Sequence, residues 1–293
     1  MKVLITGGSG FLGRYINQYF KDYNVFNLGR HENCKFKFDL KDKIDLLPFF
    51  DLVIHAAGKA HFKPINSLEE NIFYQINVDG LRNLLDGLNS NPPKYFVFIS
   101  SVSVYGLANG TNINEEFPLA ATDSYGKSKV KAEMILQQWC NEKNVKCTIF
   151  RLPLIVGKSA PGNLGDLYKS IKKGYYFNVG KGKAKKSMVL ASDIVKYIIP
   201  ASKIGGIYNL TDGYHPSVGQ LSQSISTKLG RNFIPNIPVF IARFISKFGD
   251  FLGLKIIPLN TDRLNKLISD LTFDDSLARE NFDWDPNRVI DSL

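Results

Sequence analysis

A tyrosine and a lysine lie four residues apart, at Tyr125 and Lys129. On a helix this spacing places both side chains on one face, about one turn apart. Because a nearby ammonium favours the phenolate, we expect Lys129 to lower the pKa of Tyr125 from about 10 toward the working pH. A phenol tuned in this way can take a proton from a sugar hydroxyl or give one to a carbonyl. A solvated surface pair has the same spacing, so the rest of the chain must decide between the two interpretations.

The first strand runs directly into a glycine-rich turn. Val3-Leu4-Ile5 is a short apolar run, and glycines follow at three-residue intervals before a helix with apolar periodicity. The first glycine allows a tight turn, the second lets the backbone approach a pyrophosphate, and the third lets the helix pack against the strand. The pattern therefore predicts that a dinucleotide cofactor binds here, at Gly7, Gly10, Phe11, Leu12 and Gly13.

The end of the second strand, 24–28, indicates which dinucleotide is bound. An NAD-binding protein usually carries an acidic residue there, which holds the ribose 2′-hydroxyl. Here Arg30 is available for a 2′-phosphate instead, which favours NADP(H), although Glu32 is close enough to keep NAD(H) as a second choice. Asp39 and Leu40 follow a further short strand and are predicted to border the adenine; a plain loop is the alternative.

The remaining strands also end in small or polar residues. In a doubly wound parallel sheet the carboxyl ends of the strands face the ligand crevice, so we expect these residues to line it. His55, at one of these ends, is interpreted as structural. The further residues predicted to contact the cofactor are Ala56, Ala57 and Gly58 after strand 51–54, Asn77 in a helix over about 67–88, Ser100 after strand 95–99, and Pro153 after strand 147–150.

The composition is that of a soluble globular protein, with 44% hydrophobic and 22% charged residues. A net charge of +10 suits nucleic acid, an anionic membrane surface or phosphorylated small molecules. Basic residues interleaved with aromatics are lacking, so a nucleic-acid role is not expected. Cys34, Cys140 and Cys147 lack metal-ligand spacing, and we interpret them as reduced thiols of a cytoplasmic protein without a metal site. No run reaches the roughly 20 apolar residues of a membrane span, so stable membrane insertion is not expected.

The order of strands and helices predicts an α/β protein with a doubly wound parallel (Rossmann) sheet and a smaller C-terminal α/β substrate domain. The cofactor domain is expected to span 1–156 plus about 188–212, and the substrate domain 157–187 plus 213–293. Near 239–251 a helix carries phenylalanines and isoleucines on one face, opposite Arg243 and Lys247. Such a helix can lie in a membrane interface, but we expect it to be buried within the substrate domain.

Taken together, these motifs resemble the extended short-chain dehydrogenase/reductase family, in the branch that acts on nucleotide-sugars. The resemblance covers nearly the whole chain and rests on the glycine loop, Asp39-Leu40, His55-Ala56-Ala57, Asn77, Ser100-Ser101 with Tyr105-Gly106, Tyr125 with Lys129, and Trp284-Asp285-Pro286. It implies that Tyr125 is the general acid/base, that Lys129 lowers its pKa and holds the nicotinamide ribose, and that Ser101 hydrogen-bonds the reacting sugar oxygen. It also implies a homodimer, paired through the helices near 67–88 and 125–140.

Within that family, a few residues distinguish the reaction. The 4,6-dehydratases carry an Asp-Glu pair directly after the catalytic hydroxyl, whereas Val102-Ser103 follows Ser101 here, so dehydration is set aside. The 4-epimerases usually have an asparagine where this chain has Leu154. The run around Leu154 is similar to NADPH-dependent 4-ketoreductases of UDP-linked N-acetyl-deoxyhexosamines, which serve surface polysaccharide biosynthesis.

The resemblance also implies a UDP-sugar substrate, bound by Ser101, Ser103, Asn163, Lys186 and Arg263. Because Lys186 stands where arginine is usual, it would act as a point charge rather than as a bidentate fork. A UDP-hexose 4-epimerase with tightly bound NAD is the alternative reaction. A non-catalytic dinucleotide-binding sensor is a more remote alternative, because such proteins typically lose the tyrosine or the lysine.

Overall fold

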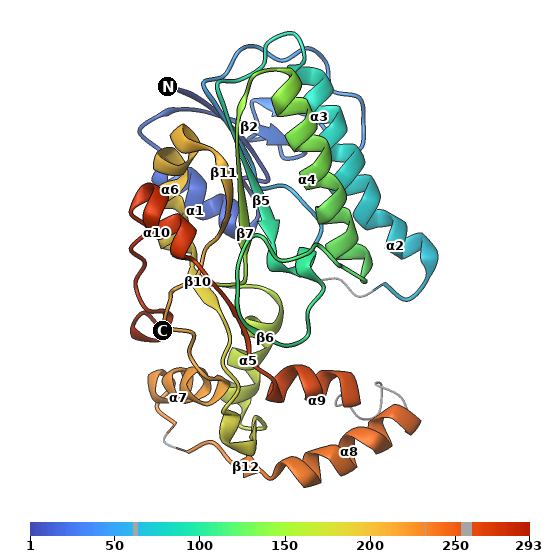
Figure 1. The fold of residues 1–293 in the computed structure, drawn as a ribbon, viewed down its shortest axis with the longest axis vertical. Helices are drawn as coiled ribbons and strands as arrows, with labels where there is room; N and C mark the ends of the chain where they lie inside the picture. Colours follow the sequence, from blue (N-terminus) through green and yellow to red (C-terminus); the bar gives the residue numbers. More distant parts are fainter. Residues whose placement is uncertain (61–63, 232, 253–259) are drawn as a thin grey trace.

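A parallel sheet of seven strands forms the larger part of the molecule (Figure 1), in a computed structural model that describes residues 1–60, 64–231, 233–252 and 260–293. The strand order is β11-β7-β5-β4-β1-β2-β3, and β1 pairs with both β2 and β4. The order therefore reverses between β1 and β4, and ligands bind at such a switch point. The strands are β1 (Lys2–Thr6), β2 (Asn24–Gly29), β3 (Phe36–Lys37), β4 (Leu52–His55), β5 (Tyr95–Ser101), β7 (Lys146–Leu152) and β11 (Gly206–Asn209).

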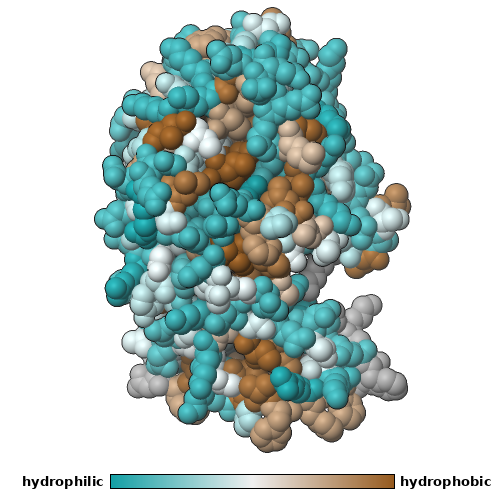
Figure 2. Space-filling view, viewed as in Figure 1, coloured by the Kyte–Doolittle hydropathy of each residue, from teal (hydrophilic) through white to brown (hydrophobic). Residues whose placement is uncertain are grey.

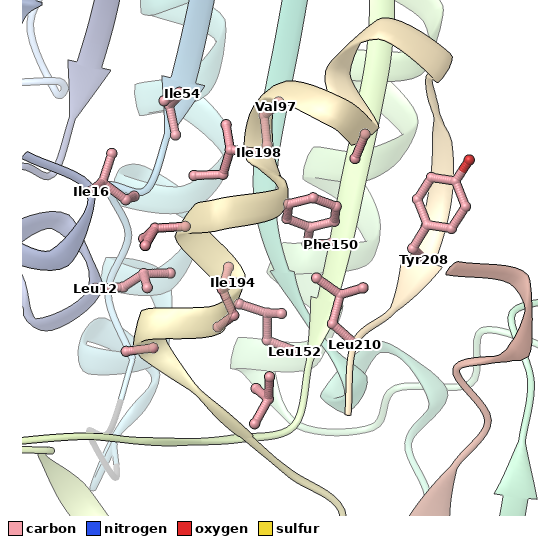
Figure 3. Close-up of a cluster of buried hydrophobic side chains, with 14 of the residues drawn as sticks. Leu12, Ile16, Ile54, Val97, Phe150, Leu152, Ile194, Ile198, Tyr208 and Leu210 are labelled. Atoms are coloured by element: carbon pink, nitrogen blue, oxygen red, sulfur yellow. The ribbon is translucent and has the colours of Figure 1, made fainter. Parts of the chain in front are cut away.

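Helices cover both faces of this sheet, because its buried strands are continuous apolar runs whose side chains point alternately to the two faces. Val3 and Ile5 of β1 pack under one layer, and Leu4 between them packs under the other. The first layer contains α1 (Phe11–Tyr19), α6 (Ala191–Ile204) and α10 (Ser276–Phe282), and Figure 3 shows α6 crossing this face of the sheet. The second contains α3 (Gly80–Leu88) and α4 (Ser124–Glu142). This arrangement confirms the predicted doubly wound α/β fold.

The helix expected over 67–88 is continuous but changes its winding. It consists of α2 (Ser67–Tyr74), a π-helical turn η1 (Gln75–Asp79) and α3. Asn77 lies within the π-helical turn and is buried. Such turns often occur at functional sites.

A smaller unit is built from short parallel strand pairs and helices around a second core. Its apolar core includes Leu164, Ile171, Leu221 and Ile225. The strand pairs are β8 (Leu154–Val156) with β10 (Met188–Leu190), β9 (Asn178–Val179) with β12 (Asn236–Ile237), and β6 (Gly110–Ile113) with β13 (Leu271–Phe273). The helices are α5 (Gly162–Lys173), α7 (Val218–Lys228), α8 (Val239–Leu252) and α9 (Thr261–Ile268), joined by short helical turns η3 (Gly180–Gly182) and η4 (Val289–Asp291).

Contacts cross the domain boundaries expected from the sequence. Phe282 of α10 and Trp284 pack in the core under the large sheet, although 213–293 was assigned to the substrate domain. In return, β6 leaves the first segment of the chain to pair with β13. A local pattern does not reveal which of two cores a short element joins, so the division at those boundaries stays a prediction.

The expectation that the helix near 239–251 is buried by its aromatic face was wrong. This helix is α8, and Phe240 is 74% exposed, Phe244 65% and Phe248 47%. Its buried positions include the small residues Ala242 and Ser246. Small side chains let the helix backbone approach the body of the protein closely, so the large ones face outward. Among the described residues, the structure contains no helix with the length and apolar character needed to cross a membrane.

Candidate active site

The start of α4 brings Tyr125 against the end of β5. Asp123 caps the helix by accepting a hydrogen bond from the backbone amide of Gly126, at 2.9 Å. A Cβ on Gly126 would lie 2.7 Å from the carbonyl oxygen of Ser103, which leaves no room for a side chain. Gly126 therefore lets the first turn of α4 pack closely on the short helical turn η2 (Val102–Tyr105).

The hydroxyl of Ser101, the last residue of β5, lies among three polar groups. Its Oγ donates to Ser103 Oγ at 3.1 Å and accepts from the Ser103 amide at 3.2 Å. The Ser101 hydroxyl also acts on the Tyr125 phenol, because its influence lowers the pKa of that group. The structure thus brings together three residues that the sequence assigned to catalysis and substrate binding. Their individual roles stay predictions.

Lys129 carries its ammonium into a buried position beside this group. Its side chain is 5% exposed, and Nζ donates to the carbonyl oxygen of Ile99 at 2.9 Å. The same Nζ lies 4.6 Å from the centre of the Phe98 ring, in a cation–π contact. Burial lowers the pKa of Lys129 to about 8, although the nearby Glu133 opposes the shift.

The pKa of Tyr125 differs from the expectation. It is raised above its ordinary value, because burial disfavours the phenolate more than the hydrogen bond with Ser101 favours it, and Asp123 adds a further rise. The Lys129 ammonium is bonded to a backbone carbonyl, and burial rather than the lysine governs the phenol. The predicted lowering by Lys129 was therefore wrong. At neutral pH the phenol holds its proton and can act as a donor.

The glycine loop after β1 has the shape needed to approach a diphosphate. Gly7 has φ of +73°, and a Cβ there would lie 2.5 Å from the Ala57 amide nitrogen. A Cβ on Gly13 would lie 2.0 Å from the Gly7 carbonyl oxygen, so the helix can pack here only without a side chain. No side chain caps the start of α1, which leaves its first amides for a phosphate group. The loop therefore has the backbone shape that a dinucleotide requires.

The loop after β4 lies beside both the glycine turn and Lys129. A Cβ on Gly58 would lie 3.4 Å from Lys129 Nζ. Asn77 fastens this loop to α4: its Oδ1 accepts from the Lys59 amide at 2.7 Å, and its Nδ2 donates to Ser128 Oγ at 2.9 Å. These bonds occupy the Asn77 amide group, so the structure gives it a positioning role. Ala56, Ala57 and Pro153 also lie at carboxyl ends of strands, beyond β4 and β7.

Arg30 stands directly after β2, at the place predicted for a 2′-phosphate. Its side chain is 76% exposed, and its NH1 lies 3.9 Å from Asp39 Oδ2. That distance in water amounts to a weak interaction. Leu40 packs beneath α3, where Asn83 Nδ2 donates to its carbonyl oxygen at 2.7 Å. The loops that follow β2 and β3 therefore lie side by side, and the predicted contacts of Arg30, Asp39 and Leu40 with the cofactor stay predictions.

A buried ion pair behind the site was not anticipated from the sequence. Glu133 of α4 pairs with Arg151 of β7 at 2.8 Å, and both are nearly inaccessible. The Ser100 hydroxyl donates to Glu133, and Arg151 also donates to the Tyr105 hydroxyl at 3.1 Å. The predicted contact of Ser100 with the cofactor stays a prediction. The available signal was spacing, because Glu133 lies four residues after Lys129 on the same helix face. This network fixes α4 against the ends of β5 and β7.

The residues predicted to bind the far part of the substrate belong to the smaller unit. Lys186 Nζ donates to the Ser269 carbonyl oxygen at 2.7 Å, and burial lowers the pKa of this ammonium. Arg263 is half-buried in the first turn of α9. Asn163 is the second residue of α5, and its side chain lies outside the described residues. The described contacts of Lys186 lead to α9 rather than to the Tyr125 cluster.

His55 is structural, as interpreted from the sequence. It is buried, its Nδ1 lies 2.7 Å from Thr6 Oγ1, and its ring stacks on Phe98. Burial lowers the pKa of His55 to about 3, so the ring stays neutral. Within the described part of the chain, no group of three potential ligands could hold a metal ion.

Known proteins resemble this chain in family and in sequence. The NAD dependent epimerase/dehydratase family matches residues 3–210. The chain is 32% identical over 252 residues to the N-acetyl-alpha-D-glucosaminyl-diphospho-ditrans,octacis-undecaprenol 4-epimerase of Escherichia coli O157:H7, a match that covers 80% of this chain and 75% of that protein. It is 24% identical over 310 residues to a UDP-glucose 4-epimerase of Vibrio cholerae, covering 98% and 92% of the two chains.

Solved structures share the fold at low sequence identity. RMD from Pseudomonas aeruginosa, complexed with NADPH, has a TM-score of 0.75 and 19% identity and covers 100% of this chain and 96% of that one. The Bordetella bronchiseptica enzyme WbmG, in complex with NAD and UDP, has a TM-score of 0.72 and 18% identity, with coverage of 98% and 89%. At these identities the likeness supports the architecture alone.

Proposed function

Because the chain belongs to the NAD dependent epimerase/dehydratase family, we propose that it carries out redox chemistry at C4 of a sugar linked to a diphosphate. The cluster of Ser101, Tyr125 and Lys129 is the observation that carries this proposal. It joins two hydroxyls and an ammonium at the carboxyl end of β5, next to a loop shaped for a dinucleotide. Such a cluster suits an alcohol/carbonyl centre.

The roles of the side chains follow from their protonation and positions. When bound, the nicotinamide group would exchange a hydride with the sugar carbon. Tyr125 holds its proton at neutral pH and would give it to the C4 oxygen as the carbonyl is reduced. Ser101, at the end of β5, would donate to the same oxygen as negative charge develops there. Lys129, with Asn77 and Gly58 around it, would hold the nicotinamide ribose.

The reaction that these features favour is reduction of a 4-keto sugar by NADPH. Arg30 supports NADP(H), since it stands exposed at the end of β2 where an acid would select NAD. A phenol that holds its proton at neutral pH can give it to a carbonyl oxygen, as reduction requires. The substrate proposed is a UDP-linked N-acetyl-deoxyhexosamine for surface polysaccharide, held by Ser103, Lys186, Arg263 and Asn163 as well. A cytoplasmic location and a homodimer belong to the same proposal.

Purified protein mixed with NADPH and a panel of UDP-4-keto sugars tests the reductase. We expect nicotinamide absorbance to fall with at least one sugar. The Tyr125→Phe variant should lose turnover while binding NADPH with nearly unchanged affinity, because it lacks only the hydroxyl. No absorbance change with any sugar would exclude reduction, and equal activity in the variant would remove Tyr125 from the mechanism.

A 4-epimerase is the second candidate, and the relatives named above favour it. The Escherichia coli protein epimerises a sugar carried on undecaprenyl diphosphate, and the Vibrio cholerae protein one carried on UDP. An epimerase retains its dinucleotide, so NAD should copurify and be found by mass spectrometry of the denatured protein. Two C4 epimers, on either carrier, should then interconvert without added cofactor. An empty or NADP-loaded protein that leaves both epimers unchanged would exclude this candidate.

A further inference from the structure

The outward face of α8 presents large apolar side chains to solvent. Phe240, Ile241, Phe244 and Phe248 are 74%, 39%, 65% and 47% exposed. The helix is held in this orientation at both ends, since Val239 packs on Gly180 and Asp250 accepts two hydrogen bonds from Thr261 at the start of α9. The exposed face is therefore a built feature of the fold.

Further exposed aromatic side chains lie near the start of this helix, at the same end of the molecule. Phe233 is 75% exposed just before β12, and Tyr175 and Phe177 are 63% and 37% exposed just before β9, which pairs with β12. Figure 1 places β12 and α8 together at the lower end of the molecule, and Figure 2 shows apolar residues on the surface there. These residues and the face of α8 form one apolar end, here called the aromatic end.

Positive charge borders the aromatic end. Segment 157–187 contains eight lysines and one aspartate, so it holds most of the chain's net charge of +10. Exposed Lys172 and Lys173 lie at the end of α5, where Arg231 NH2 donates to the Lys172 carbonyl oxygen, and exposed Lys181 lies in η3. Exposed Arg243 and Lys247 lie on α8 itself. Aromatic and aliphatic side chains rimmed by lysine and arginine have the composition of an interfacial membrane helix.

We propose that the aromatic end docks on the surface of an anionic lipid bilayer. A second copy of the chain would bring the same positive charge to this face, so electrostatic repulsion would disfavour pairing of two copies there. The exposed residues stand on a convex helix rather than lining a groove, which fits a deformable, extended surface better than a peptide. Anionic headgroups complement the lysines, while the phenylalanines enter the headgroup boundary.

Docking would hold the substrate-binding side of the smaller unit at the membrane. Helix α9, which carries Arg263, is bonded to α8 through Asp250 and Thr261. A sugar diphosphate attached to a lipid carrier would therefore be presented at the side where α8 rests. The docking itself does not depend on the proposed reaction, because vesicle binding is measured without substrate.

Co-sedimentation of the full chain with lipid vesicles tests the proposal. The probes are vesicles of phosphatidylcholine alone and of phosphatidylcholine mixed with phosphatidylglycerol. We expect binding to the mixed vesicles, and a loss of about tenfold in partitioning when Phe244→Ser and Phe248→Ser are combined, since two membrane-facing side chains are removed. Arg243→Glu with Lys247→Glu, or raised salt, should weaken binding by a similar factor.

A matched control separates docking from general stickiness. Leu46 and Ile204 are 65% and 43% exposed on the other unit, so Leu46→Ser with Ile204→Ser removes comparable apolar exposure elsewhere. That variant should bind vesicles like the natural chain, and all variants should bind NADPH and melt normally. The proposal is overturned if the natural chain stays in the supernatant, or if the phenylalanine variant binds equally well. A change of oligomeric mass in that variant without vesicle binding would assign the face to a protein partner instead.

Discussion

Lys129 is a charged group in a position that penalises charge. Its pKa of about 8, against an ordinary 10.5, means that the folded protein destabilises the ammonium by a difference worth roughly 3 kcal/mol at most. The hydrogen bond to the Ile99 carbonyl and the Phe98 ring only partly offset this penalty. A residue retained at such a cost is typical of a functional site.

Replacing this lysine should therefore stabilise the fold while removing activity. We expect Lys129→Met to raise the free energy of unfolding by about 2 kcal/mol, after allowing for the unpaired Ile99 carbonyl. Below pH 8 both folded and unfolded chains carry the charged lysine, so the gain is complete; from pH 8 to 10.5 the folded protein loses its proton first, and the gain fades. Urea unfolding of the variant and of the natural chain, below pH 8 and near pH 10.5, measures the gain in stability. Lys127→Met, on the exposed side of the same turn, should change little, and a variant less stable at every pH would make Lys129 structural.

The Glu133–Arg151 pair should respond in the opposite direction. Removing one partner leaves an uncompensated charge in a buried site, so Arg151→Met should lower the free energy of unfolding by about 3–5 kcal/mol. The double variant with Glu133→Leu should recover much of this loss, because neither charge then remains. Denaturant titration of the three variants measures the coupling. Equal stability of the single variant and the natural chain would show that the pair is not desolvated.

Lys129 could be predicted from the sequence, whereas the Glu133–Arg151 pair could not. Tyr125, Lys129 and Ser101 could be found because each lies in a short motif with its own chemical logic. The direction of the Tyr125 pKa shift could not be predicted, because it depends on burial and on the hydrogen bond that Lys129 makes to the Ile99 carbonyl oxygen. Glu133 was missed for a related reason, since its partner Arg151 lies on β7 and not on the same helix.

At the scale of elements, the register of α4 against η2 places the phenol. Gly126→Ala would put a Cβ 2.7 Å from the Ser103 carbonyl oxygen, so the first turn of α4 must move away. Because a displacement near 1 Å can cost about 100-fold in rate, we expect turnover to fall by at least tenfold. Stability should fall by only about 1–3 kcal/mol, the usual cost of overpacking. Steady-state kinetics and thermal melting separate the two effects, with Lys127→Ala as the control; unchanged turnover would mean that the turn tolerates the methyl group.

Periodicity predicted most elements but not the partners of their faces. The strands of the large sheet and the helix over 67–88 appear where the apolar pattern placed them. For α8 the same pattern wrongly predicted that the aromatic face is buried. An amphipathic pattern shows that a helix has an apolar face, but it does not show what covers that face. The inward position of Ala242 and Ser246 was the overlooked signal.

At the scale of the whole molecule, the chain returns to its first core after building the second. Trp284 packs under the large sheet and donates from Nε1 to the Thr211 carbonyl oxygen at 2.9 Å. Val289, a few residues later, packs in the second core, so the last segment contributes to both cores and a linear division of the sequence cannot assign it. Topology of this kind depends on long-range packing that no local pattern contains.

The proposed homodimer would form through the surface of α2 and α4. The outer faces of α2 and α4 enclose an open hollow lined in part by Tyr74, Val130 and Met134, and Met134 is 55% and Leu119 beside it 39% exposed. A stable dimer buries roughly 800 Å² on each partner, and these helices offer an apolar strip for it. Light scattering should give twice the chain mass, and Leu119→Glu with Met134→Glu should give the monomer, because four carboxylates would meet across a twofold axis. NADPH binding should survive, since the glycine loop lies within one chain; a natural chain that is already monomeric would remove the dimer from the proposal and leave the chemistry of Tyr125 untouched.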